Sequence, residues 1–244
     1  MIRLIIGSIT VFLYLLLTLP MLLALWIMGF VNKGLKDRIS HAMIKWAFKL
    51  LLFVCGVRYD AYGTENIPDD RSVLFVGNHR SIFDILLMYV HTKMPTGIIA
   101  KKEMRKIPVF NIWMGNIGCL FLDRDDIKQG LKTILAAIDM VKNGMCMAIF
   151  PEGTRNKVEG TFLPFKAGSF KIAEKSKCDV IPFAVIGAAA AFEDHKPYVK
   201  KSHVIICFGE PIRTADISKD ELKVIHETAR NEVMRMYEEN KDKI

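Results

Sequence analysis

The sequence predicts an α/β protein with a mostly parallel central sheet flanked by helices, preceded by an N-terminal hydrophobic two-helix membrane module. Two observations carry this prediction. From about residue 58 onward, short apolar runs typical of buried strands alternate with amphipathic helical segments. Before that point, residues 2–31 carry a single charge, at Arg3. We therefore expect residues 1–57 to associate with a membrane and residues 58–244 to form one α/β domain.

The composition is apolar and basic. Hydrophobic residues make up 51% of the 244, and the formal net charge is +8. Such a chain suits an anionic membrane surface or anionic substrates, with nucleic acid as the other standard partner. The five cysteines are an odd number without a C-x-x-C pair, and most lie in apolar runs. We therefore expect reduced core thiols, with neither a disulfide framework nor a metal site.

The N-terminal segment is long enough to cross a bilayer. As one helix, residues 2–31 would extend about 45 Å, with a kink at Pro20. The apolar region is too long for a signal peptide, and no small-x-small cleavage site follows it. Residues 39–57 are amphipathic, with Lys45 and Lys49 on one face, and suit an interface. Either the first helix spans and the second lies on the surface, or both form a hairpin in one leaflet; the pattern alone slightly favours the span.

The α/β domain follows in a regular order of strands and helices. The expected strands are 57–62, at an edge, then 72–76, in the interior, and 97–100, 118–122, 145–150, 180–186 and 203–208. The expected helices are 85–91, 108–116, 127–142, 170–177 and 219–239. Asn143-Gly144 ends the helix before it, and Ser218 is placed to cap the last helix.

One turn, between strand 72–76 and the next helix, carries a candidate catalytic pair. His79 precedes Asp84 by five residues. On a continuous helix their side chains would diverge by roughly 140°, so they meet only if His79 lies in the turn and Asp84 in the first helical turn. The carboxylate can then orient one ring nitrogen and leave the other free as a base. Ser81 is better placed as a helix cap than as a nucleophile, because no G-x-S-x-G motif surrounds it.

Three further polar clusters, at 101–105, 123–126 and 151–155, follow predicted strands. Ligands of open α/β sheets bind at that edge. The cations that could converge there on a phosphate are Arg80, Lys101, Lys102, Arg105, Arg124, Arg155 and Lys166. Gly153 would let a phosphate approach the backbone, and Glu152 could take a hydroxyl or hold an arginine. The P-loop and G-x-G-x-x-G patterns are absent, which argues against nucleotide chemistry.

Four sequence blocks, in order, resemble the glycerophospholipid acyltransferase superfamily, in particular the bacterial 1-acyl-sn-glycerol-3-phosphate acyltransferases. The first block, N-H-x-S-x-x-D, is residues 78–84. The second begins at Lys102 and runs through Pro108 to F-L-D-R at 121–124. The third, F-P-E-G-T-R, is residues 150–155, followed by Asn156 where the family often has serine. The fourth is V-I-P at 180–182, so the resemblance covers roughly residues 59–208.

The resemblance implies acyl transfer from a thioester to the 2-hydroxyl of lysophosphatidic acid, giving phosphatidic acid without an acyl-enzyme. His79 would be the general base, held by Asp84. The residues implied in glycerol phosphate binding are Arg124, Glu152, Gly153, Thr154 and Arg155, with Lys102 adding charge. No cofactor or metal is implied, and the donor is acyl-CoA or acyl carrier protein. The resemblance also shifts our expectation for residues 1–57 towards the one-leaflet hairpin, with the catalytic domain on the cytoplasmic face of the inner membrane.

Several alternatives stay open at this point. Another lysophospholipid, or glycerol 3-phosphate, could be the acceptor. The same His–Asp pair could activate water in a membrane-bound acyl thioesterase, and the basic face could serve a lipid-binding scaffold. Nucleic-acid binding is poorly supported, because the basic residues fall at strand ends and near the hydrophobic helices, without a known binding motif.

Overall fold

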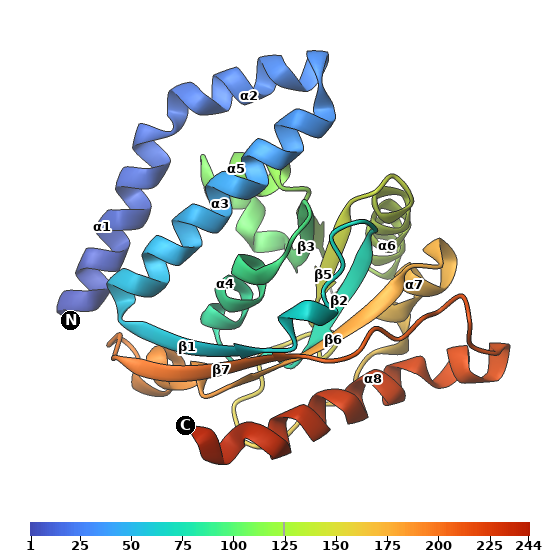
Figure 1. Ribbon diagram of the computed structural model, residues 1–244. Coiled ribbons are helices and arrows are strands. Elements are labelled where there is room, and N and C mark those ends of the chain that lie inside the picture. Colours follow the sequence, from blue (N-terminus) through green and yellow to red (C-terminus); the bar gives the residue numbers. More distant parts are fainter. Residues whose placement is uncertain (124) are drawn as a thin grey trace.

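The computed structural model describes residues 1–123 and 125–244. Those residues form a seven-stranded sheet in the order β1-β7-β6-β2-β5-β3-β4 (Figure 1). The strands are β1 (Val57–Tyr62), β2 (Val73–Gly77), β3 (Thr96–Lys101), β4 (Leu120–Leu122), β5 (Cys146–Ile149), β6 (Asp179–Ile186) and β7 (Ser202–Phe208). All neighbouring strands are parallel apart from β6 and β7, which confirms the mostly parallel sheet, with β1 at an edge and β2 inside.

Helices cover both faces of the sheet. The helices of the domain are α4 (Ile82–His91), α5 (Phe110–Asn116), α6 (Ile127–Lys142), α7 (Lys171–Ser176) and α8 (Lys219–Asn240). Strand β2 shows how the faces divide: Val73 and Phe75 join the core beneath α4 and α5, and Leu74 and Val76 join the core beneath α6, α7 and α8. Every residue of β2 is buried, because both faces are covered.

Three helices, and not two, form the N-terminal region: α1 (Ile2–Leu17), α2 (Leu19–Val31) and α3 (Lys33–Cys55). The first apolar stretch bends by 50° between α1 and α2. Pro20 lies in the first turn of α2, where its missing N–H is tolerated, so the helix breaks just before the proline. Among the described residues no single helix is long and apolar enough to cross a membrane; the bent α1–α2 pair reaches that length and composition only as a pair.

Helix α3 contacts the C-terminal end of α4. Lys45 Nζ donates a hydrogen bond to the Thr92 carbonyl at 2.6 Å, and His41 Nε2 lies 2.8 Å from Thr92 Oγ1. Thr92 Oγ1 itself donates to the Tyr89 carbonyl, so the His41 nitrogen is the donor in that pair. Burial lowers the pKa of His41 to about 4, and the ring is therefore neutral. These contacts satisfy groups at the C-terminal end of α4 that the helix leaves without partners.

The predicted helix 127–142 is confirmed at both ends, since Asp126 accepts a hydrogen bond from the Gln129 N–H and Asn143 follows the last turn. Helix α5 begins at Phe110, two residues later than predicted, because Val109 has a left-handed backbone with φ of 63°. All five cysteines are buried and unpaired, as the sequence predicts. The division into units 1–57 and 58–244 stays a prediction.

Candidate active site

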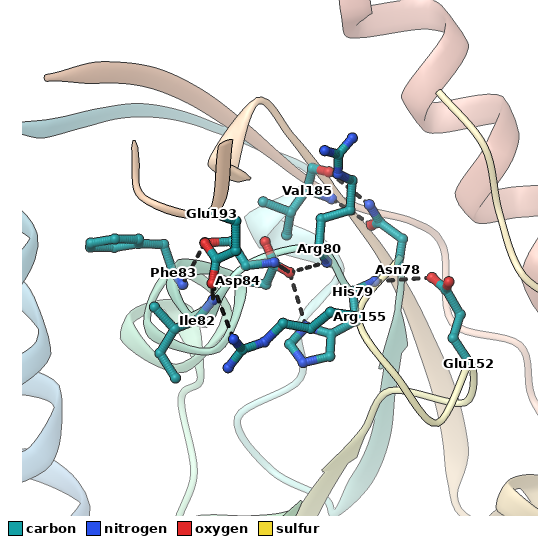
Figure 2. Close-up of polar contacts among 11 residues, drawn as sticks. Asn78, His79, Arg80, Ile82, Phe83, Asp84, Glu152, Arg155, Val185 and Glu193 are labelled. Carbon is teal, nitrogen blue, oxygen red and sulfur yellow. Dashed lines mark hydrogen bonds and ion pairs between the residues drawn. The ribbon is translucent and has the colours of Figure 1, made fainter. Parts of the chain in front are cut away.

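The first turn of α4 brings His79 and Asp84 together, as the sequence predicts. His79 Nδ1 lies 3.0 Å from Asp84 Oδ2, and both side chains are buried (Figure 2). The same carboxylate oxygen accepts the backbone N–H groups of Arg80 and Ser81, each at 2.7 Å. Three donors thus hold the carboxylate, and His79 Nδ1 is one of them. The other ring nitrogen, Nε2, is left as an acceptor for a proton.

The helix begins at Ile82, three residues earlier than the sequence pattern indicates. Ser81 is the N-cap, and its hydroxyl oxygen accepts the Phe83 N–H at 3.1 Å. In return, the Asp84 carboxylate accepts the Ser81 backbone N–H, which completes a capping box. The predicted capping role of Ser81 is confirmed.

Phe150, directly after β5, packs against the His79 ring. Its ring stacks on the imidazole of His79, with centroids 4.1 Å apart and an angle of 22° between the planes. The stack restricts rotation of the imidazole about its own bond to the chain. Phe150 belongs to the F-P-E-G-T-R block, but the sequence gives it no role. Its contact with His79 depends on the adjacency of β2 and β5.

The loop after β5 holds the backbone of His79 on both sides. The His79 N–H donates to Glu152 Oε1 at 3.0 Å, and the His79 carbonyl accepts the Asn156 N–H at 2.7 Å. The other oxygen of Glu152 accepts the Leu163 N–H at 3.3 Å. Burial raises the pKa of Glu152 to about 7, against the opposing effect of these two N–H groups. Glu152 thus contacts the catalytic turn and lies outside the residues that line the cavity.

Asn78 ties the same turn to β6. Its side-chain amide donates to the Val185 carbonyl and accepts the Val185 N–H, both at 2.8 Å. The backbone pairing of β2 with β6 ends one residue earlier, at Gly77. The amide therefore extends the hydrogen bonding between β2 and β6 by one residue and keeps the two strands together next to His79.

The predicted cations lie in different surroundings. Arg155 lines the cavity beside His79 and pairs with Glu193 at 3.2 Å. Gly153, with φ of 73°, and Thr154 line the same wall. Lys102 pairs with Asp123 at 2.7 Å and lies outside the cavity lining. Arg124, which the sequence assigns to phosphate binding, lies outside the described residues.

Arg80 also lines the cavity, although its charge is already paired. Its guanidinium contacts Glu159 at 2.5 Å and Asp194 at 3.2 Å. Both acids come from loops far along the chain. Arg80 therefore serves to join these loops to the catalytic turn.

A cavity of about 940 Å³ extends from this pair into the protein. Its polar end is lined by His79, Arg155 and Lys166, and its apolar part by side chains from α1, α3 and α5. The apolar part includes Tyr14, Phe48, Trp113, Met114, Ile117 and Cys119. A molecule with a charged head and a long hydrocarbon chain matches both ends. No group of three or more potential metal-binding side chains occurs in 1–123 or 125–244.

The site is thus a buried His–Asp pair at a cavity lined by both cationic and apolar side chains. The chain belongs to the Acyltransferase family, whose model matches residues 58–186. It is 34% identical over 145 residues to the 1-acyl-sn-glycerol-3-phosphate acyltransferase of Borreliella burgdorferi, covering 59% of this chain and 58% of that protein. The enzyme of the same name from Helicobacter pylori is 31% identical, with 70% and 72% covered.

A solved structure matches the whole arrangement. It is the crystal structure of the 1-acyl-sn-glycerophosphate (LPA) acyltransferase PlsC from Thermotoga maritima, with a TM-score of 0.82 and 26% identity. The match covers 98% of this chain and 94% of that one, and so includes α1, α2 and α3. The chain spans less than two thirds of the length of the B. burgdorferi relative.

Proposed function

We propose that this protein transfers a fatty acyl group from an acyl thioester to the sn-2 hydroxyl of lysophosphatidic acid, giving phosphatidic acid. The observation that carries the proposal is the position of the His79 ring in the wall of a cavity that is also lined by cations and by apolar side chains, with Asp84 buried behind it at 3.0 Å. The names of the relatives and of the solved structure support the choice of acceptor.

In the proposed reaction, His79 Nε2 takes the proton of the acceptor hydroxyl as its oxygen attacks the thioester carbonyl. Asp84 stabilises the imidazolium that forms, and its three hydrogen bonds keep the ring oriented. Collapse of the tetrahedral intermediate breaks the carbon–sulfur bond, and His79 returns the proton to the departing thiolate. The attacking oxygen belongs to the substrate, so the reaction needs no serine or cysteine nucleophile.

Arg155, with the backbone around Gly153 and Thr154, is the proposed site for the acceptor phosphate. A guanidinium presents several N–H groups to a phosphate at once, and the Lys166 ammonium lies against Gly153. Arg124 and Lys102 stay predictions from the sequence for the same phosphate. Lys102 would first have to leave Asp123.

The apolar part of the cavity is proposed to hold an acyl chain. Exposed apolar side chains on α1 and α2, among them Phe12, Trp26 and Phe30, suit insertion into one leaflet of a bilayer. We propose that the catalytic domain then lies at the cytoplasmic face of the inner membrane, where acyl-CoA and acyl carrier protein are both accessible.

The test is a donor-by-acceptor activity matrix with the full chain in detergent or lipid. His79→Ala should abolish transfer while the protein keeps its melting behaviour, and Asp84→Asn should lose at least about 100-fold in kcat. Free fatty acid released as fast without acceptor as with it would identify a thioesterase. Equal transfer to acceptors lacking the phosphate would refute the assigned acceptor.

A further inference from the structure

Glu193 joins two parts of the site that lie far apart in the chain. It follows β6, at the start of a short 3-10 helix (Glu193–His195) that none of the four sequence blocks includes. One carboxylate oxygen accepts the Ser81 hydroxyl at 2.5 Å. The other accepts hydrogen bonds from the Ile82 N–H at 3.1 Å and from Arg155 Nη1 at 3.2 Å (Figure 2). The side chain is only 11% exposed. A single carboxylate therefore connects the first turn of α4 to the cation proposed for phosphate binding.

The N-terminus of α4 offers favourable partners to this partly buried carboxylate. The Ile82 N–H has no partner within the helix and donates to Glu193 instead. Together with the positive end of the helix dipole, it favours a negative charge at this point. Ser81 uses its one hydroxyl proton on Glu193 while its oxygen caps the helix. Glu193 is thus fixed by α4 on one side, independently of Arg155. Its remaining contact can therefore fix the position of a cationic group.

Arg155 is that group. Its side chain is 40% exposed, and Glu193 is the acid that holds it among the described residues. The pair occupies Nη1, which leaves other guanidinium N–H groups for a ligand in the cavity. An arginine ordered before binding loses less conformational entropy when the ligand arrives.

We propose that Glu193 is a positioning residue that sets the guanidinium of Arg155 for the acceptor phosphate, at a fixed place relative to His79. The inference rests on the proposed function, because it concerns the phosphate of the same acceptor. Glu193 thus contributes to the affinity for the acceptor and takes no part in the proton transfer by His79.

The experiment compares steady-state kinetics of the wild type, Glu193→Gln, Arg155→Ala and the double variant, with lysophosphatidate varied at saturating donor and the donor varied at saturating lysophosphatidate. Glutamine keeps an acceptor for Ile82 but loses the charge that holds Arg155. We expect Glu193→Gln to raise KM for lysophosphatidate about five-fold, with kcat and the donor KM unchanged. In the Arg155→Ala background the same substitution should have no further effect on KM.

Asp179→Asn is the matched control. Asp179 is 12% exposed and pairs with Arg71, which is 49% exposed, at 3.1 Å. This pair resembles the Glu193 pair in burial and geometry, but it lies at the opposite end of β6 from the site. Asp179→Asn should leave KM for lysophosphatidate unchanged. A rise equal to that of Glu193→Gln would mean that any lost surface charge has this effect, and would overturn the inference.

Two other outcomes would also overturn it. One is an equal rise in KM with and without Arg155, because Glu193 would then act through α4 alone. The other is a fall in kcat with KM unchanged, which would place its effect on the catalytic pair. Calorimetric titration with lysophosphatidate, without donor, keeps the two proposals apart: a wild type that neither binds nor acylates it refutes the proposed function, and an active wild type with an unaltered Glu193→Gln variant refutes only the role of Glu193.

Discussion

Replacing Glu152 with glutamine isolates the energetic cost of a buried acid that supports the catalytic turn. Glu152 is 4% exposed, and its two oxygens accept the N–H groups of His79 and Leu163. Glutamine has nearly the same shape and keeps one carbonyl oxygen for the His79 N–H. The substitution removes the titrating group while leaving the turn largely intact.

The sign of the effect follows from the pKa. Burial raises the pKa of Glu152 from 4.5 to about 7 in the folded protein. Between these values the folded state keeps the proton and the unfolded state loses it, so rising pH lowers the stability of the wild type. A rise from 4.5 to about 7 corresponds to about 3 kcal/mol at about 1.36 kcal/mol per pH unit. The loss is complete above the folded pKa and absent below the unfolded one.

Glutamine does not titrate, so Glu152→Gln should gain stability relative to the wild type by up to about 3 kcal/mol between pH 4.5 and pH 8. Urea unfolding of both proteins in the same detergent, at several pH values across this range, measures the difference. Other acids contribute equally to both proteins and cancel. Parallel stability curves would refute the reasoning, because they would show that the two N–H groups fully offset the burial of the carboxylate.

Three further substitutions test other parts of the site. Asn78→Ala leaves both backbone groups of Val185 without their side-chain partner and should cost about 2–4 kcal/mol of unfolding free energy in urea titrations, whereas a loss below about 0.5 kcal/mol would show that water replaces the amide. Gly153→Ala places a Cβ 2.7 Å from Lys166 Nζ at a φ of 73° and should cost about 1 kcal/mol by thermal unfolding, with a raised acceptor KM. Cys119→Phe should shift the donor preference to shorter acyl chains by filling the apolar cavity; an unchanged preference in a chain-length series would place the chain elsewhere.

The sequence predicts the elements best where local signals decide them. Helix α6 has a capping aspartate at one end and Asn143-Gly144 at the other, and both boundaries are confirmed. The His79–Asp84 contact is likewise confirmed, because a five-residue spacing across a turn allows only a few geometries. The prediction for helix α5 differs only at its start, by two residues, because the positive φ of Val109 has no signal in the sequence.

Contacts between residues that lie far apart in the chain cannot be predicted from local sequence patterns. Glu193 is 112 residues from Ser81, and no motif links them. The expectation that Glu152 takes a hydroxyl or holds an arginine stays a prediction, but its contact with the His79 backbone N–H has no signal in the sequence. That contact forms because β5 lies beside β2, and strand order cannot be deduced from the pattern of any one strand.

The contacts of α3 with the end of α4 bear on how this protein can be handled. A fragment without residues 1–55 would be the usual route to a soluble sample. In this chain that deletion would remove the contacts of Lys45 and His41 with Thr92, at the C-terminal end of α4. Helix α4 has only ten residues, and its first turn holds Asp84. It would also open the cavity along the side formed by Tyr14 and Phe48. Helices α1 and α3 are therefore part of the cavity wall, and an inactive fragment would reflect the loss of that wall.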